Sequence, residues 1–113
     1  MIEAGRELDA MVAEQIMQLK LVGEKDYDIC YEIKRCGQNW YPSVPHYSTQ
    51  ISAAWEVVEK LLDWEFKLFG GERHADGWYA MFIGNYGNWH SDINSVTPAH
   101  AICLAALAAV EAK

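Results

Sequence analysis

Residues 45–61 read PHYSTQISAAWEVVEKL, and this stretch combines a helix start, an amphipathic helix and a tryptophan that we expect to be buried. Either Ser48 or Thr49 can cap the helix, because a hydroxyl oxygen at that point accepts a bond from a free backbone N–H of the first turn. Apolar residues then recur at three- and four-residue steps, which gives the helix one apolar face. That face consists of Ile51, Ala54, Trp55, Val58, Leu61 and Leu62.

Two further segments have the period of a helix. Residues 3–19 carry an apolar stripe with the same spacing, which predicts the first helix. Towards the end of the chain, Thr97 suits an N-cap and Pro98 suits the first helical position, where its missing N–H would be unpaired anyway. Residues 99–110 are apolar on nearly every side, so we expect this helix to be buried by the sheet and by another subunit.

Strands are predicted where apolar residues alternate or cluster in short runs. Residues 26–34 alternate and predict one strand. Residues 64–69 and 77–83 predict an antiparallel hairpin, and a short strand follows over residues 89–93. Residues 35–47 contain glycine and two prolines without a clear period, so we expect a long loop, a kind that is often functional.

Together these elements predict a single domain over residues 1–113 of the α+β class, in the order α-β-α-β-β-(β)-α. In it, three helices pack on an antiparallel sheet. The net charge of −7 argues against DNA, RNA or an anionic membrane as a partner. The N-terminus lacks the apolar core of a signal peptide, and three cysteines are an odd number, so we expect a cytoplasmic protein with free thiols.

The residue types used in catalysis and metal binding occur without the required spacing. Cys30 and Cys36 are too far apart for a zinc pair, and no second pair accompanies them and His46. Neither cysteine lies at the N-terminus of a predicted helix, and His90 with Asp92 forms only a weak local pair. We therefore expect a protein that is not an enzyme and that has no metal or cofactor.

A better candidate for binding lies in residues 85–92, NYGNWHSD, where aromatic rings alternate with amides. Rings can stack on a nucleobase and amides can bond its edges. The alternative is a hairpin loop whose rings cover the core or a dimer interface. The predicted stacking residues are Trp78, Tyr86 and Trp89, the predicted edge-binding residues are Asn85, Asn88 and Asp92, and the predicted phosphate-binding residues are Arg35 and Arg73.

Three segments, residues 4–14, 47–60 and 97–107, resemble the phage ABA-sandwich domain family. The resemblance implies a phage or prophage origin and a sheet layered between helices. Some proteins of this kind are similar to the anti-Thoeris sponge proteins of phages, which bind a cyclic ADP-ribose-type immune signal without cleaving it and assemble as oligomers. Related sequences tend to place arginine after the Ala-Ile-Cys triplet, where this chain has Leu104.

The resemblance and the aromatic segment together suggest a function. The leading hypothesis is a non-enzymatic protein that sequesters a small cyclic nucleotide in the cytoplasm of the infected host. Its site would lie partly at the boundary between subunits of a homo-oligomer. The alternative hypothesis is a phage accessory module that binds a protein partner through exposed aromatic residues.

Overall fold

The computed structural model describes residues 3–25, 28–61, 64–69, 77–84, 87–90 and 97–111. Their elements follow the order α1 (Arg6–Gln15), β1 (Lys20–Lys25), β2 (Asp28–Arg35), β3 (Gln38–Trp40), α2 (Ile51–Lys60), β4 (Glu65–Phe69), β5 (Tyr79–Gly84), β6 (Gly87–His90) and α3 (Pro98–Glu111). The predicted class is confirmed: three helices combine with antiparallel strands.

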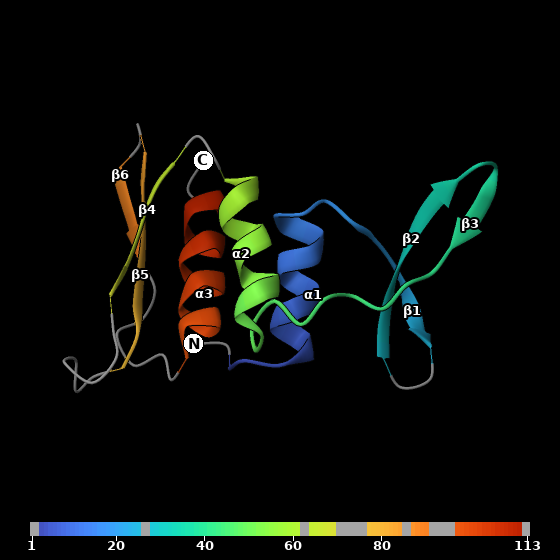
Figure 1. The fold of residues 1–113 in the computed structure, drawn as a ribbon, viewed down its shortest axis with the longest axis horizontal. Coiled ribbons are helices and arrows are strands. Elements are labelled where there is room, and N and C mark those ends of the chain that lie inside the picture. The colour runs from blue at the N-terminus through green and yellow to red at the C-terminus, as the bar shows by residue number, and fades with distance from the viewer. Residues whose placement is uncertain are drawn as a thin grey trace.

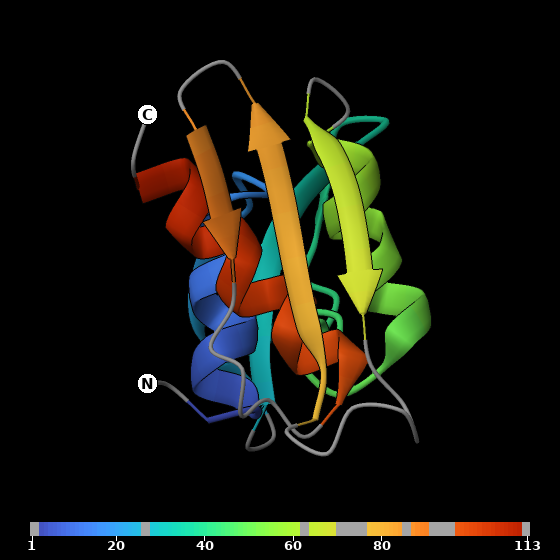
Figure 2. The same ribbon diagram turned by 90° about the vertical axis from the view of Figure 1, so that its left-hand side faces the viewer.

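The helices form a layer between two sheets. The strand orders in the described residues are β1-β2-β3 and β4-β5-β6, with antiparallel neighbours throughout. Figure 1 shows one sheet at each end of the molecule and the helices in the middle. In Figure 2, α3 passes behind β5 and β6 while α2 lies behind the β4 edge. The predicted order omitted β1 and β3. The prediction of a single sheet is also wrong, because the strands form two sheets that lie on opposite sides of the helices (Figure 1).

The first helix is shorter than predicted. It ends at Gln15 rather than residue 19, and Gln18 adopts a left-handed backbone with φ of 58°. From Lys20 onward the chain instead pairs with β2, beginning opposite Glu32. Pairing with a neighbouring strand satisfies backbone groups over several residues, and this outweighs a weak local preference for helix.

Helix α3 forms the centre of the core, as its apolar composition predicted. Nine of its residues are buried, among them Ile102, Cys103 and Leu107. The helix contacts α1 and α2 on one side and β5 and β6 on the other. Its predicted cap is confirmed, because the backbone N–H of His100 donates to Thr97 Oγ1 at 3.2 Å.

The second helix buries only part of the face that the sequence predicted: Ala54 is buried, and Val58 and Leu61 pack against the core. Trp55 and Ile51 are 48% and 49% exposed, whereas Ala53, Ala54 and Val57 are buried. Helix α2 packs against α3, and the small side chains at its buried positions let the two backbones approach closely. A tryptophan does not fit such an interface. The Trp55 ring instead contacts Phe66 of β4 edge-on, with a centroid distance of 5.8 Å.

A buried carboxylate joins α1 to the segment that precedes α2. Asp9 is fully buried, and its Oδ1 accepts hydrogen bonds from the Ser48 backbone N–H at 2.8 Å and from the Ser48 hydroxyl at 2.6 Å. Its Oδ2 accepts from Arg6 Nη1 at 2.8 Å. Ser48 is therefore not the predicted cap of α2; the N-cap residue is Gln50, without a side-chain bond. A buried carboxylate needs donors, and Ser48 supplies two of them.

Gly84, at the end of β5, leaves room for a tryptophan. A Cβ atom at this position would lie 2.5 Å from Trp64 Cε3 and 2.5 Å from Cζ3. We expect Gly84→Ala to lower the free energy of unfolding by about 1–3 kcal/mol, because the buried ring has to move. Urea denaturation measures this cost. The same substitution in a Trp64→Phe background should cost less, and equal costs in both backgrounds would refute the steric explanation.

Candidate functional site

The second and third strands form a hairpin with a two-residue turn. Arg35 pairs with Gln38, and the intervening Cys36 and Gly37 have positive φ angles of 51° and 79°. Two left-handed residues in succession match the right-handed twist of the flanking strands. Glycine adopts this conformation readily, whereas at Cys36 it is unusual for a residue with a side chain.

The hairpin register places several side chains on one face. Ile33 pairs with Trp40, and Arg35 pairs with Gln38, and residues directly opposite each other in antiparallel strands share a face. The bridge between Cys30 and Ser43 keeps the same register further along the hairpin. Because faces alternate along a strand, this register also places Pro42 on the face of Trp40.

This shared face covers the core at one end and is open at the other. Ile29 and Tyr31 pack against the buried core. Further along the same strand Ile33 is only partly buried, and Trp40 opposite it is 54% exposed. Figure 1 shows β3 and the end of β2 projecting away from α1. The apolar face thus extends past the helices that would otherwise cover it.

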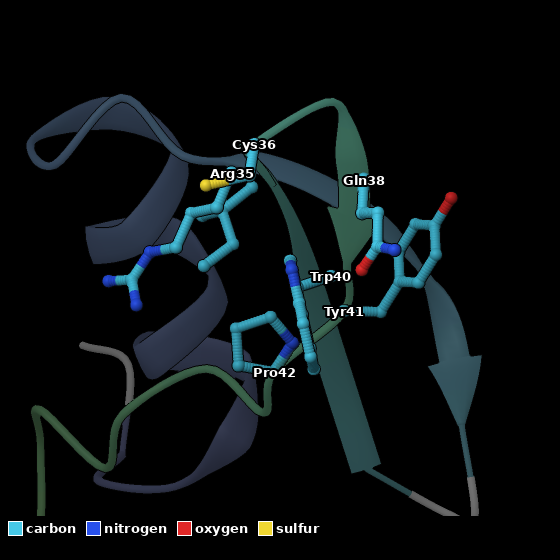
Figure 3. A pocket seen from close by; sticks show the side chains of 7 residues that line it. Arg35, Cys36, Gln38, Trp40, Tyr41 and Pro42 are labelled. Atoms are coloured by element: carbon cyan, nitrogen blue, oxygen red, sulfur yellow. The ribbon is translucent and has the colours of Figure 1, made fainter.

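A pocket of about 550 Å³ lies on this open part of the hairpin. Its lining residues are Ile33, Arg35, Cys36, Gln38, Trp40, Tyr41 and Pro42. In Figure 3 the Trp40 ring stands edge-on, with Arg35 and Pro42 to one side and Gln38 and Tyr41 to the other. The volume is in the range of small-molecule pockets, which combine an apolar lining with a few polar groups.

The lining offers three kinds of recognition. An exposed indole can stack on a planar ring. A guanidinium can bind a phosphate with two parallel hydrogen bonds, and Arg35 is exposed at the pocket. The Gln38 amide can both donate and accept a hydrogen bond. This combination suits an anionic ligand that contains an aromatic ring.

The structure separates the residues that the sequence assigned to one site. Arg35 lines the pocket on β2, whereas Trp78 adjoins β5 and packs against the core. The helical layer lies between their sheets, so one chain does not bring the two together. Asn88 and Trp89 belong to β6, of which only the backbone is described. The other predicted site residues, Arg73, Asn85, Tyr86 and Asp92, lie outside the described part of the chain.

Several pocket residues were not among the predicted ones. Trp40, Tyr41 and Pro42 form a consecutive run inside the predicted loop 35–47. The signal that could have identified them is the Cys36-Gly37 pair, which lies between a clear strand and a tryptophan at the spacing of a tight hairpin. Recognising this turn would have placed Trp40 opposite Ile33.

The buried polar groups Asp9 and Ser48 are hydrogen-bonded to each other. Ser48, His46 and Asp9 lie close together, but the fully buried Ser48 hydroxyl donates to Asp9 itself, and His46 Nδ1 is 3.9 Å from Asp9 Oδ2. This is not the serine-to-histidine bond of a nucleophile–base pair. Burial, with a contribution from Asp9, raises the pKa of the Cys103 thiol far above its ordinary value. Within the described residues no cluster of three His, Cys, Asp or Glu side chains can hold a metal ion.

The fold should weaken at alkaline pH. Burial, followed by the charge of Glu56, raises the pKa of Tyr47 to about 12. Because the pKa of Tyr47 is higher in the folded state than in the unfolded state, the protonated phenol favours folding. This contribution to stability is complete below the unfolded pKa of about 10 and is lost as the pH rises towards 12. We expect the free energy of unfolding to fall by about 1.4 kcal/mol from this group between pH 9 and pH 11.

The test of this pH dependence is urea denaturation at pH 9 and pH 11. Tyr47→Phe has no hydroxyl to titrate, so it should lose less stability over this interval than the wild type. An equal loss in the two proteins would show that Tyr47 does not contribute.

Comparisons with known proteins identify the relatives of this fold. The family model of the phage ABA sandwich domain matches residues 10–107. The 2.0 Å crystal structure of a phage protein from Bacillus cereus ATCC 14579 is similar, with a TM-score of 0.73 and 26% sequence identity over 97% of this chain and 94% of that one. A search of curated proteins finds no match. In the described residues, no helix has both the length and the apolar character needed to cross a bilayer.

Proposed function

This chain belongs to the phage ABA sandwich domain family, and we propose that it is a non-enzymatic protein that sequesters a small cyclic nucleotide of the cyclic ADP-ribose type. The protein would act in the cytoplasm of the infected host cell. Removing such a signal from solution would keep it from its receptor and so counteract an anti-phage defence.

The observation that carries the proposal is the pairing of an indole and a guanidinium on one face of the β2–β3 hairpin. Trp40 is 54% exposed and Arg35 lies at the same pocket. An adenine ring would stack on Trp40, and the phosphates would meet Arg35. Stacking on an aromatic side chain contributes about 1–3 kcal/mol per base, and a charge-assisted bond to phosphate adds about 1.5–3 kcal/mol.

The lining also supports binding without turnover. Its members supply two aromatic rings, a cation, an amide, the Cys36 thiol and apolar contacts, and they include no histidine or carboxylate that could serve as a base beside that thiol. General acid–base catalysis most often uses those two groups.

The proposal is tested by a thermal-shift screen followed by calorimetry. The panel contains cyclic ADP-ribose isomers, linear ADP-ribose and AMP. A ligand at one hundred times its dissociation constant stabilises the folded state by about 2.7 kcal/mol, so a true ligand raises the melting temperature clearly. The nucleotide recovered after denaturation should be chemically unchanged. A cleaved product would instead indicate an enzyme.

A second candidate is a module that binds a protein partner. The observation in its favour is the exposure of large apolar side chains at two places, Trp40 and Tyr41 on the hairpin and Ile51 and Trp55 on α2. Exposed aromatic residues often mark protein interfaces. Two results together would favour this module. No nucleotide of the panel would raise the melting temperature, and a protein that co-purifies with the wild type would be lost on Trp40→Ala substitution.

A further inference from the structure

Strand β4 forms an edge of its sheet. It pairs with β5 from Glu65 opposite Ile83 to Phe69 opposite Tyr79, and among the described residues no strand pairs with its other side. Figure 2 shows β4 at the border of the sheet, with α2 behind it. An uncovered strand edge presents unpaired backbone N–H and C=O groups, and these can pair with another chain.

The two faces of β4 differ in chemistry. Phe66 and Leu68 point towards the helices and pack against the core. Glu65 and Lys67 point to the other face, with side chains 64% and 48% exposed and a separation of 4.0 Å between Oε1 and Nζ. The solvent face of this edge therefore carries one negative and one positive group, two residues apart.

The helix beside this edge carries uncovered apolar side chains. Trp55 and Ile51 are one helical turn apart on α2, and both are about half exposed. The Trp55 ring contacts Phe66, whose own ring lies 5.1 Å from Phe82 in the core. The apolar layer under the sheet thus continues from the core to the β4 edge and ends there at Trp55.

We propose that two copies of this chain associate through antiparallel pairing of their β4 edges, about a two-fold axis at Phe66. The paired strands would join two three-stranded sheets into one of six strands. This register places Glu65 opposite the partner's Lys67, and Lys67 opposite the partner's Glu65. Phe66 faces the partner's Phe66, and each Trp55 covers the junction from its own helix.

The charges of Glu65 and Lys67 favour a two-fold axis at Phe66 over one at Lys67. An axis at Lys67 would pair five residues of each strand, but it would place Lys67 opposite the partner's Lys67. Like charges directly opposite each other destabilise a strand pair, whereas opposite charges stabilise it. Both axes are allowed for an antiparallel ladder, in which bonded and non-bonded pairs alternate. The net charge of −7 per chain opposes association in general, so local complementarity has to favour this contact.

A charge exchange tests the proposal. Wild-type protein should sediment as a dimer in analytical ultracentrifugation. Glu65→Lys and Lys67→Glu each place like charges opposite each other twice, so each should raise the dimer dissociation constant about tenfold or more. The double variant E65K/K67E restores opposite charges and should return the constant to near the wild-type value. Glu14→Lys on α1 and Lys34→Glu on β2 change the net charge equally at exposed positions and should leave the dimer intact.

A second measurement needs no substitution. Hydrogen exchange of the wild-type protein should show β4 amides that gain protection as the concentration rises through the dimer range. The proposal is overturned by a monomer at all concentrations, by a double variant as dissociated as the single ones, or by β4 exchange that is independent of concentration. The contact lies on the sheet opposite the ligand pocket, so these outcomes do not depend on nucleotide binding.

Discussion

Asp9→Ala is expected to lower the free energy of unfolding by about 3–5 kcal/mol, because it removes the acceptor of a buried network. The Asp9 carboxylate accepts three hydrogen bonds, two from Ser48 and one from Arg6. Without it the buried Ser48 N–H and the charge of Arg6 lose their main partner. The network links α1 to the start of α2, so its loss should destabilise the whole helical layer. Urea denaturation followed by circular dichroism gives the change.

Two further variants separate the network from a general effect of losing an acidic residue. Glu7→Ala removes an exposed carboxylate from the same helix and should change stability by less than about 0.5 kcal/mol. Ser48→Ala deletes one of the three bonds, and a double-mutant cycle with Asp9→Ala should give a coupling energy of about 1 kcal/mol or more. A stability within 1 kcal/mol of wild type for Asp9→Ala would contradict this role of the network.

Trp40→Ala is expected to weaken nucleotide binding about 10- to 100-fold while leaving the fold intact. The side chain is 54% exposed, so its removal takes little from the core. It does remove the aromatic surface on which we propose that the base stacks, and such losses amount to about 1–3 kcal/mol. Calorimetry with the best nucleotide of the screen measures the change. Trp40→Phe keeps an aromatic ring and should recover part of the affinity.

The control for this variant lies on the same strand. Asn39 is exposed and pairs with Lys34, so it belongs to the opposite face of the hairpin. Asn39→Ala should bind nucleotide as the wild type does. Arg35→Gln should weaken binding and make the remaining affinity less sensitive to salt, because the contact with phosphate is electrostatic. An affinity unchanged by both Trp40→Ala and Arg35→Gln would place the ligand elsewhere.

The parts of the fold that local patterns determine could be predicted from the sequence. The Thr97-Pro98 pair predicted the start of α3, and the alternation of apolar and polar residues predicted the strand that the structure shows as β2. Strand β1 was missed because its residues form a strand only through pairing with β2. The exposure of Trp55 was missed for a related reason: periodicity shows that a helix has an apolar face, but not which part of that face a neighbouring helix covers.

The candidate site was only partly predictable. Arg35 was assigned to phosphate binding, and the structure places it at the pocket. Trp40 was absent from the predicted site because its position beside Arg35 depends on a turn at Cys36-Gly37, a pair without the usual asparagine or aspartate of such turns. A one-residue change in that register would move Trp40 to the other face of the strand.

The most direct measurement is the identification of small molecules released from the protein. The chain is purified from cells that produce a cyclic ADP-ribose-type signal, denatured, and the supernatant is analysed by mass spectrometry. We expect an intact cyclic nucleotide from the wild type and little or none from Trp40→Ala. A wild-type protein that releases no nucleotide and binds none of the added panel would contradict the proposed function.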